Sequence, residues 1–358
     1  MTRLIFTGGF LGAGKTTLLY ELITILNNRG LKTGIITNDQ APDLADTSLL
    51  EHADVNIAEV SGSCFCCDFK GLRKAMEKVG KKFKTDVILA EPVGSCTDLT
   101  ATLIKPIQDL MKTEISVSPL SVLADPARLK DILNGGTAGL HPSAAYIYRK
   151  QLEESDIILI TKTDLYSNEQ IRTLLEKLRE SFPECKAFTA SAKTGEGMAE
   201  WLDYVLSHDE AGKQIIDVDY DRYAEGEAVL GWLNCSASVA AQNVNWDDFT
   251  KRVMEDMAGK LDQGNTPIGH VKMMTENGDN YISANLTGRS ESLTYRWSAG
   301  VSKEAEVIVN ARVQMEPKEL EQLFLSSFKT VCGSEIKYRI NRIRSISPGY
   351  PKPTHRYK

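Results

Sequence analysis

The segment that most constrains the fold is the glycine-rich run at residues 9–16, Gly-Phe-Leu-Gly-Ala-Gly-Lys-Thr. It matches the pattern G-x-x-x-x-G-K-[ST], and it lies between a short apolar run at 4–7 and an amphipathic stretch that stops at Gly30. In this pattern the backbone N–H groups of the loop and the N-terminus of the following helix together hold a phosphate group. The motif therefore predicts a nucleotide-binding α/β domain at the start of the chain.

Each residue of this loop has an expected role. Lys15 is expected to reach the β- and γ-phosphates, and the hydroxyl of Thr16 is expected to ligate Mg²⁺. Thr17 is expected near the α-phosphate. The other expected phosphate-binding residues of the loop are the small residues Gly9, Gly12, Ala13 and Gly14.

The rest of the first 206 residues alternates short β-branched runs with helical patterns. This alternation predicts an α/β domain with a doubly wound, mostly parallel sheet covered by helices. The expected strands lie at 4–7, 34–37, 55–60, 87–90, 121–124, 157–161 and 187–189.

The second half of the chain has a different pattern. Residues 207–227 are polar and mostly acidic, which indicates a linker. In 228–335 strands are separated by only a few turn residues, which predicts antiparallel pairing in a smaller α+β domain. Residues 336–358 contain seven Lys and Arg and no carboxylate. We expect a solvated basic tail there, and docking onto the acidic linker or an acidic partner is the alternative.

The composition excludes several classes of protein. With 42 Lys and Arg against 48 Asp and Glu, the net charge of −6 argues against a nucleic-acid binder. No apolar run approaches the roughly 20 residues of a membrane span, and the first residues lack a signal-peptide core, so we expect a cytoplasmic protein. Seven cysteines, three of them within four residues, do not suit a secreted disulfide framework.

Two later elements favour guanine as the base. Residues 161–164, Thr-Lys-Thr-Asp, end an apolar strand, and an aspartate at 164 can accept both the N1–H and the N2–H₂ groups of guanine. Adenine offers no such pair of donors. Residues 191–193, Ser-Ala-Lys, follow the next expected strand and resemble a loop that packs against the base. The expected base-binding residues are Thr161, Lys162, Asp164, Ser191, Ala192 and Lys193.

Residues 91–94, Glu-Pro-Val-Gly, end the strand at 87–90. Glu91 is expected to hold Mg²⁺ through water or to position the attacking water, and the amide of Gly94 is expected to contact the γ-phosphate. The acidic loop after the second strand fits either a cluster of helix caps or a switch segment that supplies oxygen ligands to a metal. This loop contains Asn38, Asp39, Asp43 and Asp46.

Residues 64–67, Cys-Phe-Cys-Cys, place three thiols in a loop after a strand. Thiolates are ligands for Zn²⁺, Co²⁺ or Cu⁺. No second Cys pair or Cys/His pair lies at zinc-finger spacing. We therefore expect an open or transient site, with two or three thiolates plus a carboxylate or water, rather than a closed four-cysteine site. Inert buried cysteines and a redox dithiol are the alternatives.

Taken together, these motifs resemble the CobW/YjiA family of metal-trafficking P-loop GTPases, which are relatives of the urease and hydrogenase nickel-insertion GTPases. The resemblance rests on the residues at 8–17, 64–67, 91–94, 151–156 and 161–165. It covers the whole first domain, and the second domain is similar in size and pattern to the C-terminal domain of the family. The candidate catalytic residues are Lys15, Glu91 and Asp39.

The resemblance also implies a transition-metal site. Its ligands would be Cys66 and Cys67, with Cys64 nearby and Asp39 as a carboxylate from the first switch. Asp39 is one methylene shorter than the glutamate that is usual in the family.

The implied function is GTP hydrolysis coupled to delivery of Zn²⁺ or Co²⁺ to a client metalloprotein or corrinoid-related enzyme. In that reading, the state of the γ-phosphate moves the switch loops and changes the metal affinity. The alternative is a regulatory protein that activates such a partner in response to GTP and metal, without delivering metal. A homodimer is compatible with both readings.

Overall fold

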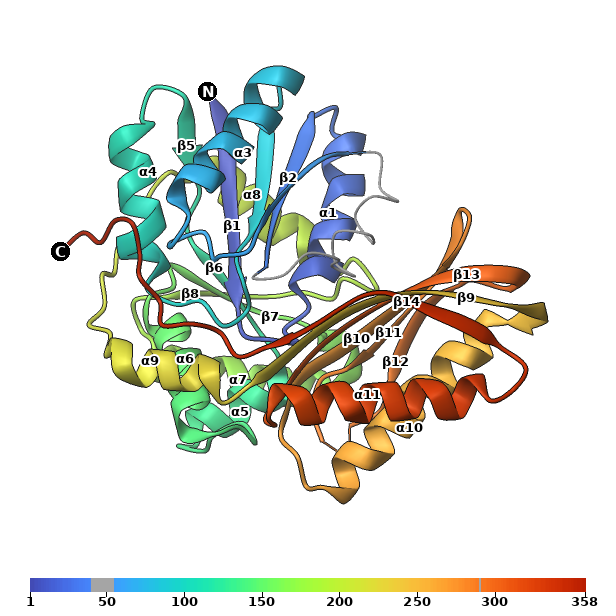
Figure 1. Cartoon of the computed structure of the whole chain (residues 1–358). Helices are drawn as coiled ribbons and strands as arrows, with labels where there is room; N and C mark the ends of the chain where they lie inside the picture. The colour runs from blue at the N-terminus through green and yellow to red at the C-terminus, as the bar shows by residue number, and fades with distance from the viewer. Residues whose placement is uncertain (40–54, 290) are drawn as a thin grey trace.

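The computed structural model describes residues 1–39, 55–289 and 291–358; for residue 39 and residues 81–83 only the backbone is described. Asp43, Asp46 and the side chain of Asp39 therefore lie outside the described residues. The described chain contains two separate β-sheets, a parallel one in the first half and an antiparallel one in the second (Figure 1).

The first sheet is parallel throughout, in the order β3-β2-β4-β1-β6-β7-β8, and β5 pairs with β1 beside this path. Its strands are β1 (Thr2–Gly9), β2 (Thr33–Asp39), β3 (Asn56–Ser61), β4 (Val87–Glu91), β5 (Ile115–Val117), β6 (Ser121–Ala124), β7 (Ile157–Ile160) and β8 (Lys186–Thr189). All seven expected strands are confirmed. The three residues of β5 are too few to give a sequence signal.

Helices cover both faces of this sheet. Leu18 of α1 and Trp201 of α8 belong to the core on one face, and Leu72 of α3 belongs to the core on the other. Adjacent residues of β4 point to opposite cores, Leu89 to the first and Ile88 to the second, which is why this strand is apolar along its whole length. The helices are α1 (Lys15–Asn28), α3 (Phe69–Phe83), α4 (Lys105–Leu110, after the π-helical turn η1, Thr100–Ile104), α5 (Pro126–Leu133), α6 (Pro142–Glu153), α7 (Asn168–Ser181, after the 3₁₀ turn η2, Thr163–Leu165) and α8 (Met198–Ser207).

The second sheet is antiparallel, in the order β12-β11-β10-β13-β9-β14. Helices α10 and α11 pack on it around a core that contains Trp246, Phe249, Phe324 and Phe328. The expected α+β domain is thus present as two layers. Its elements are β9 (Gly231–Asn245), α10 (Trp246–Gln263), β10 (Ile268–Asn277), β11 (Asn280–Leu286), β12 (Thr294–Ser298), β13 (Val301–Val313), α11 (Pro317–Cys332) and β14 (Lys337–Ile346).

The acidic segment between the sheets contains a helix, α9 (Tyr220–Ala228). Asp219 caps it by accepting hydrogen bonds from the backbone N–H groups of Asp221 and Arg222. Tyr223 is buried, and α9 packs against α6. The helix therefore attaches this segment to the first domain, directly before β9 begins the second.

The expectation of a solvated tail is wrong. Residues 337–346 form β14, which pairs with β9 at the edge of the second sheet. Its isoleucines recur every third residue, at 340, 343 and 346. The register shift between Ile340 and Arg342 lets Ile340 and Ile343 both pack on the core of the second domain, whereas Ile346 packs on the core of the first domain. A search for strict alternation therefore misses this strand. The last residues, 347–358, run back across the first domain and end beside α4 (Figure 1). We call residues 347–358 the C-terminal strap.

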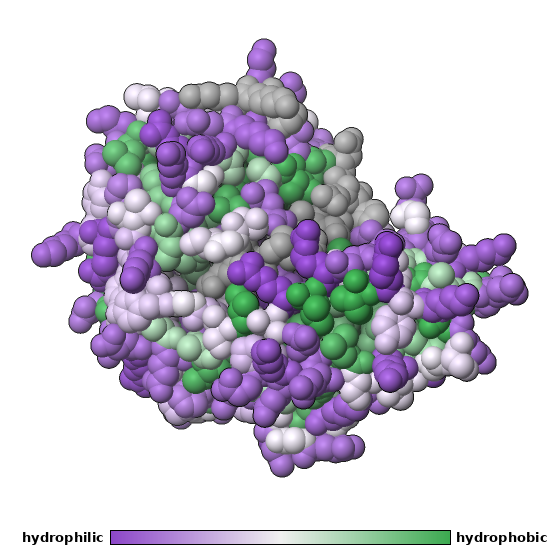
Figure 2. Space-filling model, viewed as in Figure 1, coloured by the Kyte–Doolittle hydropathy of each residue, from purple (hydrophilic) through white to green (hydrophobic). Residues whose placement is uncertain are grey.

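The face crossed by the strap is mainly hydrophilic (Figure 2). Among the described residues, no helix combines the length and the apolar character needed to span a membrane.

Candidate functional site

The glycine-rich loop joins β1 to α1, as the motif predicts. Gly9, Gly12 and Gly14 have φ values of 128°, 79° and 89°, a region that favours glycine. At Gly9 a Cβ atom would also lie 2.4 Å from the carbonyl oxygen of Leu123. The loop therefore needs glycine both for its dihedral angles and for its close approach to β6.

Side chains suited to phosphate and Mg²⁺ meet at this loop. The hydroxyl of Thr16 donates to the carboxylate of Glu91, 3.1 and 3.0 Å from its two oxygens, and both side chains are buried. The ammonium of Lys15 donates to the carbonyl of Gly9 at 2.9 Å. A hydroxyl and a carboxylate are hard oxygen donors, so Thr16 and Glu91 fit a Mg²⁺ ion.

The 91–96 segment passes close to the same lysine. A Cβ atom on Gly94 would lie 3.0 Å from the Nζ of Lys15 and 2.7 Å from the Cδ2 of Leu11, so a larger residue here would displace the ends of these two side chains. The amide of Gln151, on α6, donates to the carbonyls of Gly94 at 3.0 Å and Cys96 at 2.7 Å. The backbone beside Lys15 is therefore held by a side chain from a neighbouring helix.

The two elements expected to bind a base lie together. Ser191 donates to the carboxylate of Asp164 at 2.7 Å, and the ammonium of Lys193 lies 4.0 Å from the same carboxylate. Thr161 donates to the carbonyl of Ala13 at 2.8 Å, and this bond ties the β7 end to the phosphate loop. Lys162 pairs with Asp125 at 2.8 Å. The segment that carries Asp164 is thus linked to the phosphate loop through Thr161, and the role of Asp164 in base binding stays a prediction.

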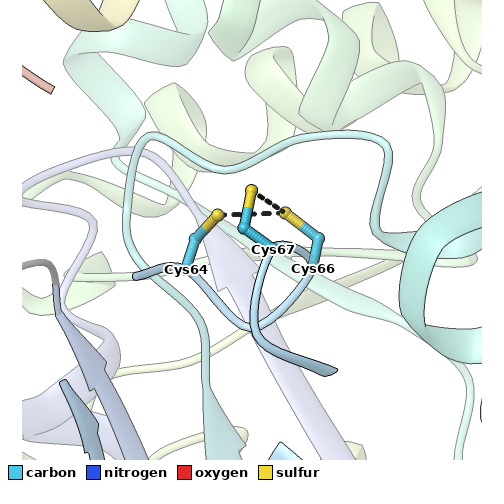
Figure 3. Close-up of side chains that lie close together, drawn as sticks. All are labelled: Cys64, Cys66 and Cys67. Atoms are coloured by element: carbon cyan, nitrogen blue, oxygen red, sulfur yellow. Dashed lines mark hydrogen bonds between the residues drawn. The ribbon is translucent and has the colours of Figure 1, made fainter. Parts of the chain in front are cut away.

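The three cysteines of the 64–67 loop point their sulfur atoms toward one another (Figure 3). The Sγ atoms of Cys64 and Cys66 are 3.1 Å apart and those of Cys66 and Cys67 are 3.9 Å apart, and all three lie within 4.8 Å of one another. The loop forms one turn that leads into α3, since the N–H groups of Cys67 and Asp68 both donate to the carbonyl of Cys64. The thiols thus sit at a helix N-terminus, whose partial positive charge favours thiolates.

Hydrogen bonds among the thiols shift their pKa values in opposite directions. Hydrogen bonds from Cys66, Cys67 and Cys96 lower the pKa of Cys64 well below its ordinary value, against the effect of burial. Its bond to Cys64 is the first cause that raises the pKa of Cys67 to about 11. Cys64 is therefore the most acidic thiol of the three.

Residues 3–189 match the family model described as CobW/HypB/UreG, nucleotide-binding domain, which is more than half of the chain. The chain belongs to the CobW/HypB/UreG family.

Similar curated proteins include zinc-regulated GTPase metalloprotein activator 1 of Dictyostelium discoideum, 28% identical over 207 residues that cover 50% of this chain and 43% of that protein. The zinc chaperone YeiR of Escherichia coli is 30% identical over 182 residues, which cover 49% of this chain and 50% of that protein. The chain therefore spans about half the length of the curated relatives it matches. Among solved structures, Zn(II)-bound YjiA GTPase from E. coli matches over 91% of this chain and 98% of that chain, with 16% identity and a TM-score of 0.35.

In this member of the CobW/HypB/UreG family, Asn38 holds the cysteine loop in place, a role that the sequence did not indicate. Its amide nitrogen donates to the carbonyls of Val60 and Ser63, both at 2.8 Å, and its amide oxygen accepts from the N–H of Phe65 at 2.8 Å. The side chain is buried at the end of β2. Asn38 thus links the end of β2 to the turn that carries the thiols.

The C-terminal strap covers the cysteine loop, which the sequence also did not indicate. The N–H of Lys352 donates to the Sγ of Cys67 at 3.2 Å, and the N–H of Thr354 donates to the carbonyl of Cys66 at 2.8 Å. Farther along, Arg356 pairs with the buried carboxylate of Asp98 at 2.7 Å. The alternative of docking on the acidic segment is also met in part, since Tyr350 donates to Asp221.

Proposed function

We propose that this chain is a GTPase that binds a transition metal at the 64–67 loop and delivers it to a client protein. The observation that carries this proposal is that the cysteine loop and the phosphate-binding residues are held by neighbouring strands of one sheet. Three sulfur atoms within 4.8 Å of one another lie on a turn that Asn38 ties to β2, next to the strand β4 that ends in Glu91. Because sulfur and phosphate sites share these strand ends, a change at one alters the backbone that holds the other.

Hydrolysis needs little from the protein beyond placement and charge. Lys15 places a positive charge at the β- and γ-phosphates, and the loop N–H groups hold them. Thr16 and Glu91 would hold Mg²⁺, which would supply positive charge to neutralise the phosphates. Glu91 is buried against Thr16, where it would orient water. In this proposal the carboxylate of Asp164, with Lys193 4.0 Å away, accepts the N–H groups of guanine.

The thiol set suits a soft or borderline cation. Tetrahedral sites with sulfur ligands favour zinc, and Co²⁺ takes the same ligands. The names of the two curated relatives, a zinc-regulated activator and a zinc chaperone, support Zn²⁺ as the cargo here. The client would be a metalloprotein; an enzyme of corrinoid metabolism is the alternative if Co²⁺ is carried.

The test loads the reduced, full-length protein with Zn²⁺ and adds GTP or a non-hydrolysable analogue in the presence of a chromogenic chelator. We expect phosphate release, and faster transfer of zinc to the chelator with GTP than with the analogue. The control is Lys15→Ala, which should bind zinc but respond to neither nucleotide. Zinc that stays bound during turnover would support the regulatory alternative, and absence of phosphate release would contradict the GTPase proposal itself.

A further inference from the structure

The C-terminal strap lies on the cysteine loop and contacts a sulfur atom of the proposed metal site directly. The N–H of Lys352 donates to the Sγ of Cys67 at 3.2 Å. Two residues later, Thr354 donates its N–H to the carbonyl of Cys66 at 2.8 Å and its hydroxyl to the carbonyl of Cys67 at 3.1 Å. Cys67 is the least buried of the three cysteines, so the strap contacts the cluster at its most accessible thiol.

A buried ion pair holds the far end of the strap. The guanidinium of Arg356 donates to the carboxylate of Asp98 at 2.7 Å, and the side chain of Asp98 is 1% exposed. The hydroxyl of Tyr220 donates to the same carboxylate at 2.7 Å, and Arg356 also donates to the carbonyl of Ile216 at 3.1 Å. Because a buried carboxylate is costly without its cation, this pair favours the docked position of the strap.

The acceptor of this ion pair belongs to the segment that leaves β4 and passes the phosphate loop. Gly94, which packs against Lys15, precedes Asp98 by four residues. Tyr357, next to the end of the strap, donates its N–H to the carbonyl of Ala101 in the following turn η1 at 2.9 Å. The strap therefore joins the cysteine loop to the segment that passes the phosphate loop.

We infer that the strap is a lid on the metal site and that the Arg356–Asp98 pair is the latch that keeps the lid closed. This inference rests on the proposed function and adds a step to it, since a client must displace the strap before it can reach the metal. While the strap is docked, Lys352 and Thr354 occupy the approach to Cys67. Release of the latch opens this approach and leaves all three thiols in place.

The first test measures the latch in the metal-free, reduced full chain by hydrogen exchange of the strap amides. We expect Arg356→Gln to raise the exchange rates of the N–H groups of Lys352, Thr354 and Tyr357 by about tenfold or more, since it removes a charged hydrogen bond. Lys352→Gln is the matched control, because Lys352 binds the loop through its backbone N–H and is exposed. Unchanged exchange rates in Arg356→Gln would overturn the latch.

The second test measures how fast a chromogenic chelator removes Zn²⁺ from the loaded, reduced full chain. We expect zinc removal from Arg356→Gln to be about tenfold faster, and removal from Lys352→Gln to match the unaltered protein. The double variant Asp98→Asn/Arg356→Gln also lacks the unpaired buried carboxylate, so it should fold and should lose zinc as fast as Arg356→Gln. Binding of GTP shows that each variant is folded.

The results distinguish failure of the lid from failure of the proposed function. Unchanged zinc removal from a variant whose strap amides exchange faster would overturn the lid while leaving the metal site intact. A chain that binds no zinc at the cysteine loop would overturn both the proposed metal delivery and the lid.

Discussion

At the residue scale, Asp164 of the proposed base site is already held in position by neighbouring side chains. Its carboxylate accepts from Ser191, it lies near Lys193, and its side chain is only 14% exposed. Two elements separated by α7 and β8 in the sequence thus converge on one acceptor. The carboxylate needs no large movement to accept a pair of N–H donors.

We predict that Asp164→Asn lowers the preference for GTP over ATP by about 10- to 100-fold. The amide replaces one acceptor with a donor, and a hydrogen bond to a charged group contributes about 1.5–3 kcal/mol. Competition binding of GTP and ATP measures the preference, with the exposed Glu169→Gln as control. An unaltered preference would remove Asp164 from the base site.

Glu154, at the end of α6, is a buried carboxyl that also affects stability. The hydroxyl of Thr97 and the N–H of Thr100 donate to its two oxygens at 2.9 and 3.0 Å. Burial, the largest effect, raises its pKa from 4.5 to about 8, although both hydrogen bonds act in the opposite direction. The carboxyl is therefore protonated in the folded protein where it would be ionised in the unfolded chain.

Because this pKa is raised on folding, the stabilising contribution is complete below pH 4.5 and is lost as the pH rises to about 8. In the unaltered protein this ionisation lowers the free energy of unfolding by up to about 1.4 kcal/mol per pH unit. We predict that the Glu154→Gln variant lacks this pH-dependent loss, so its stability relative to the unaltered protein increases as the pH rises. Denaturant unfolding at several pH values measures the difference. The neighbouring Glu153→Gln, which is paired with Lys150 at the surface, should keep the original pH dependence. Parallel pH profiles for Glu154→Gln and the unaltered chain would contradict this.

At the element scale, the sequence predicts a helix or strand best where one simple hydrophobic pattern or one motif covers the whole element. The strands of the first sheet and the loop at 9–16 follow from continuous apolar runs and from one motif. The strand β14 does not, because a register shift interrupts its alternation and its isoleucines pack on two different cores.

The sequence also says little about elements that act through backbone atoms. The strap binds the cysteine loop mostly through N–H and carbonyl groups, which any residue except proline supplies in full. The side-chain contacts of the strap are made with partners far away in the sequence: Arg356 pairs with Asp98, more than 250 residues earlier, and Tyr350 donates to Asp221.

We predict that deleting the strap, residues 347–358, raises the rate at which a chelator removes zinc by about tenfold. The deletion removes the N–H donated to Cys67 and several other hydrogen bonds, each worth about 0.5–1.5 kcal/mol. Stopped-flow chelation measures the rate, and Lys358→Ala, at the exposed end of the strap, is the control. Equal rates with and without the strap would show that it does not limit access to the loop.

At the scale of the whole molecule, the second domain contacts the nucleotide-binding half at the phosphate loop itself. The buried guanidinium of Arg128, on α5, donates to the carbonyl of Leu11 at 2.8 Å and, in the second domain, to those of Ile268 at 2.8 Å, Gly269 at 3.0 Å and Thr287. A second contact joins Glu21 of α1 to Arg296 of β12 at 2.6 Å. Arg128 thus connects the phosphate loop to the second domain through hydrogen bonds.

We predict that Arg128→Met destabilises the protein by about 2–4 kcal/mol and also weakens GTP binding. Methionine fills similar volume, but it leaves four carbonyls without their shared donor, and buried unsatisfied acceptors are costly. Denaturant unfolding and nucleotide titration test the two effects, with the exposed Arg252→Met as control. A variant with unchanged stability and unchanged GTP affinity would mean that the two domains do not support the loop.

The most direct test of the coupling between the two sites is a Co²⁺ titration of the reduced full chain with Mg²⁺ and either GDP or a non-hydrolysable GTP analogue. The absorption band from thiolate to cobalt reports binding at the cysteine loop. If the state of the γ-phosphate shifts the strand ends that the two sites share, the two nucleotides should give Co²⁺ affinities that differ by at least about fivefold. Equal affinities would contradict the coupling, and absence of the band would contradict the thiolate site.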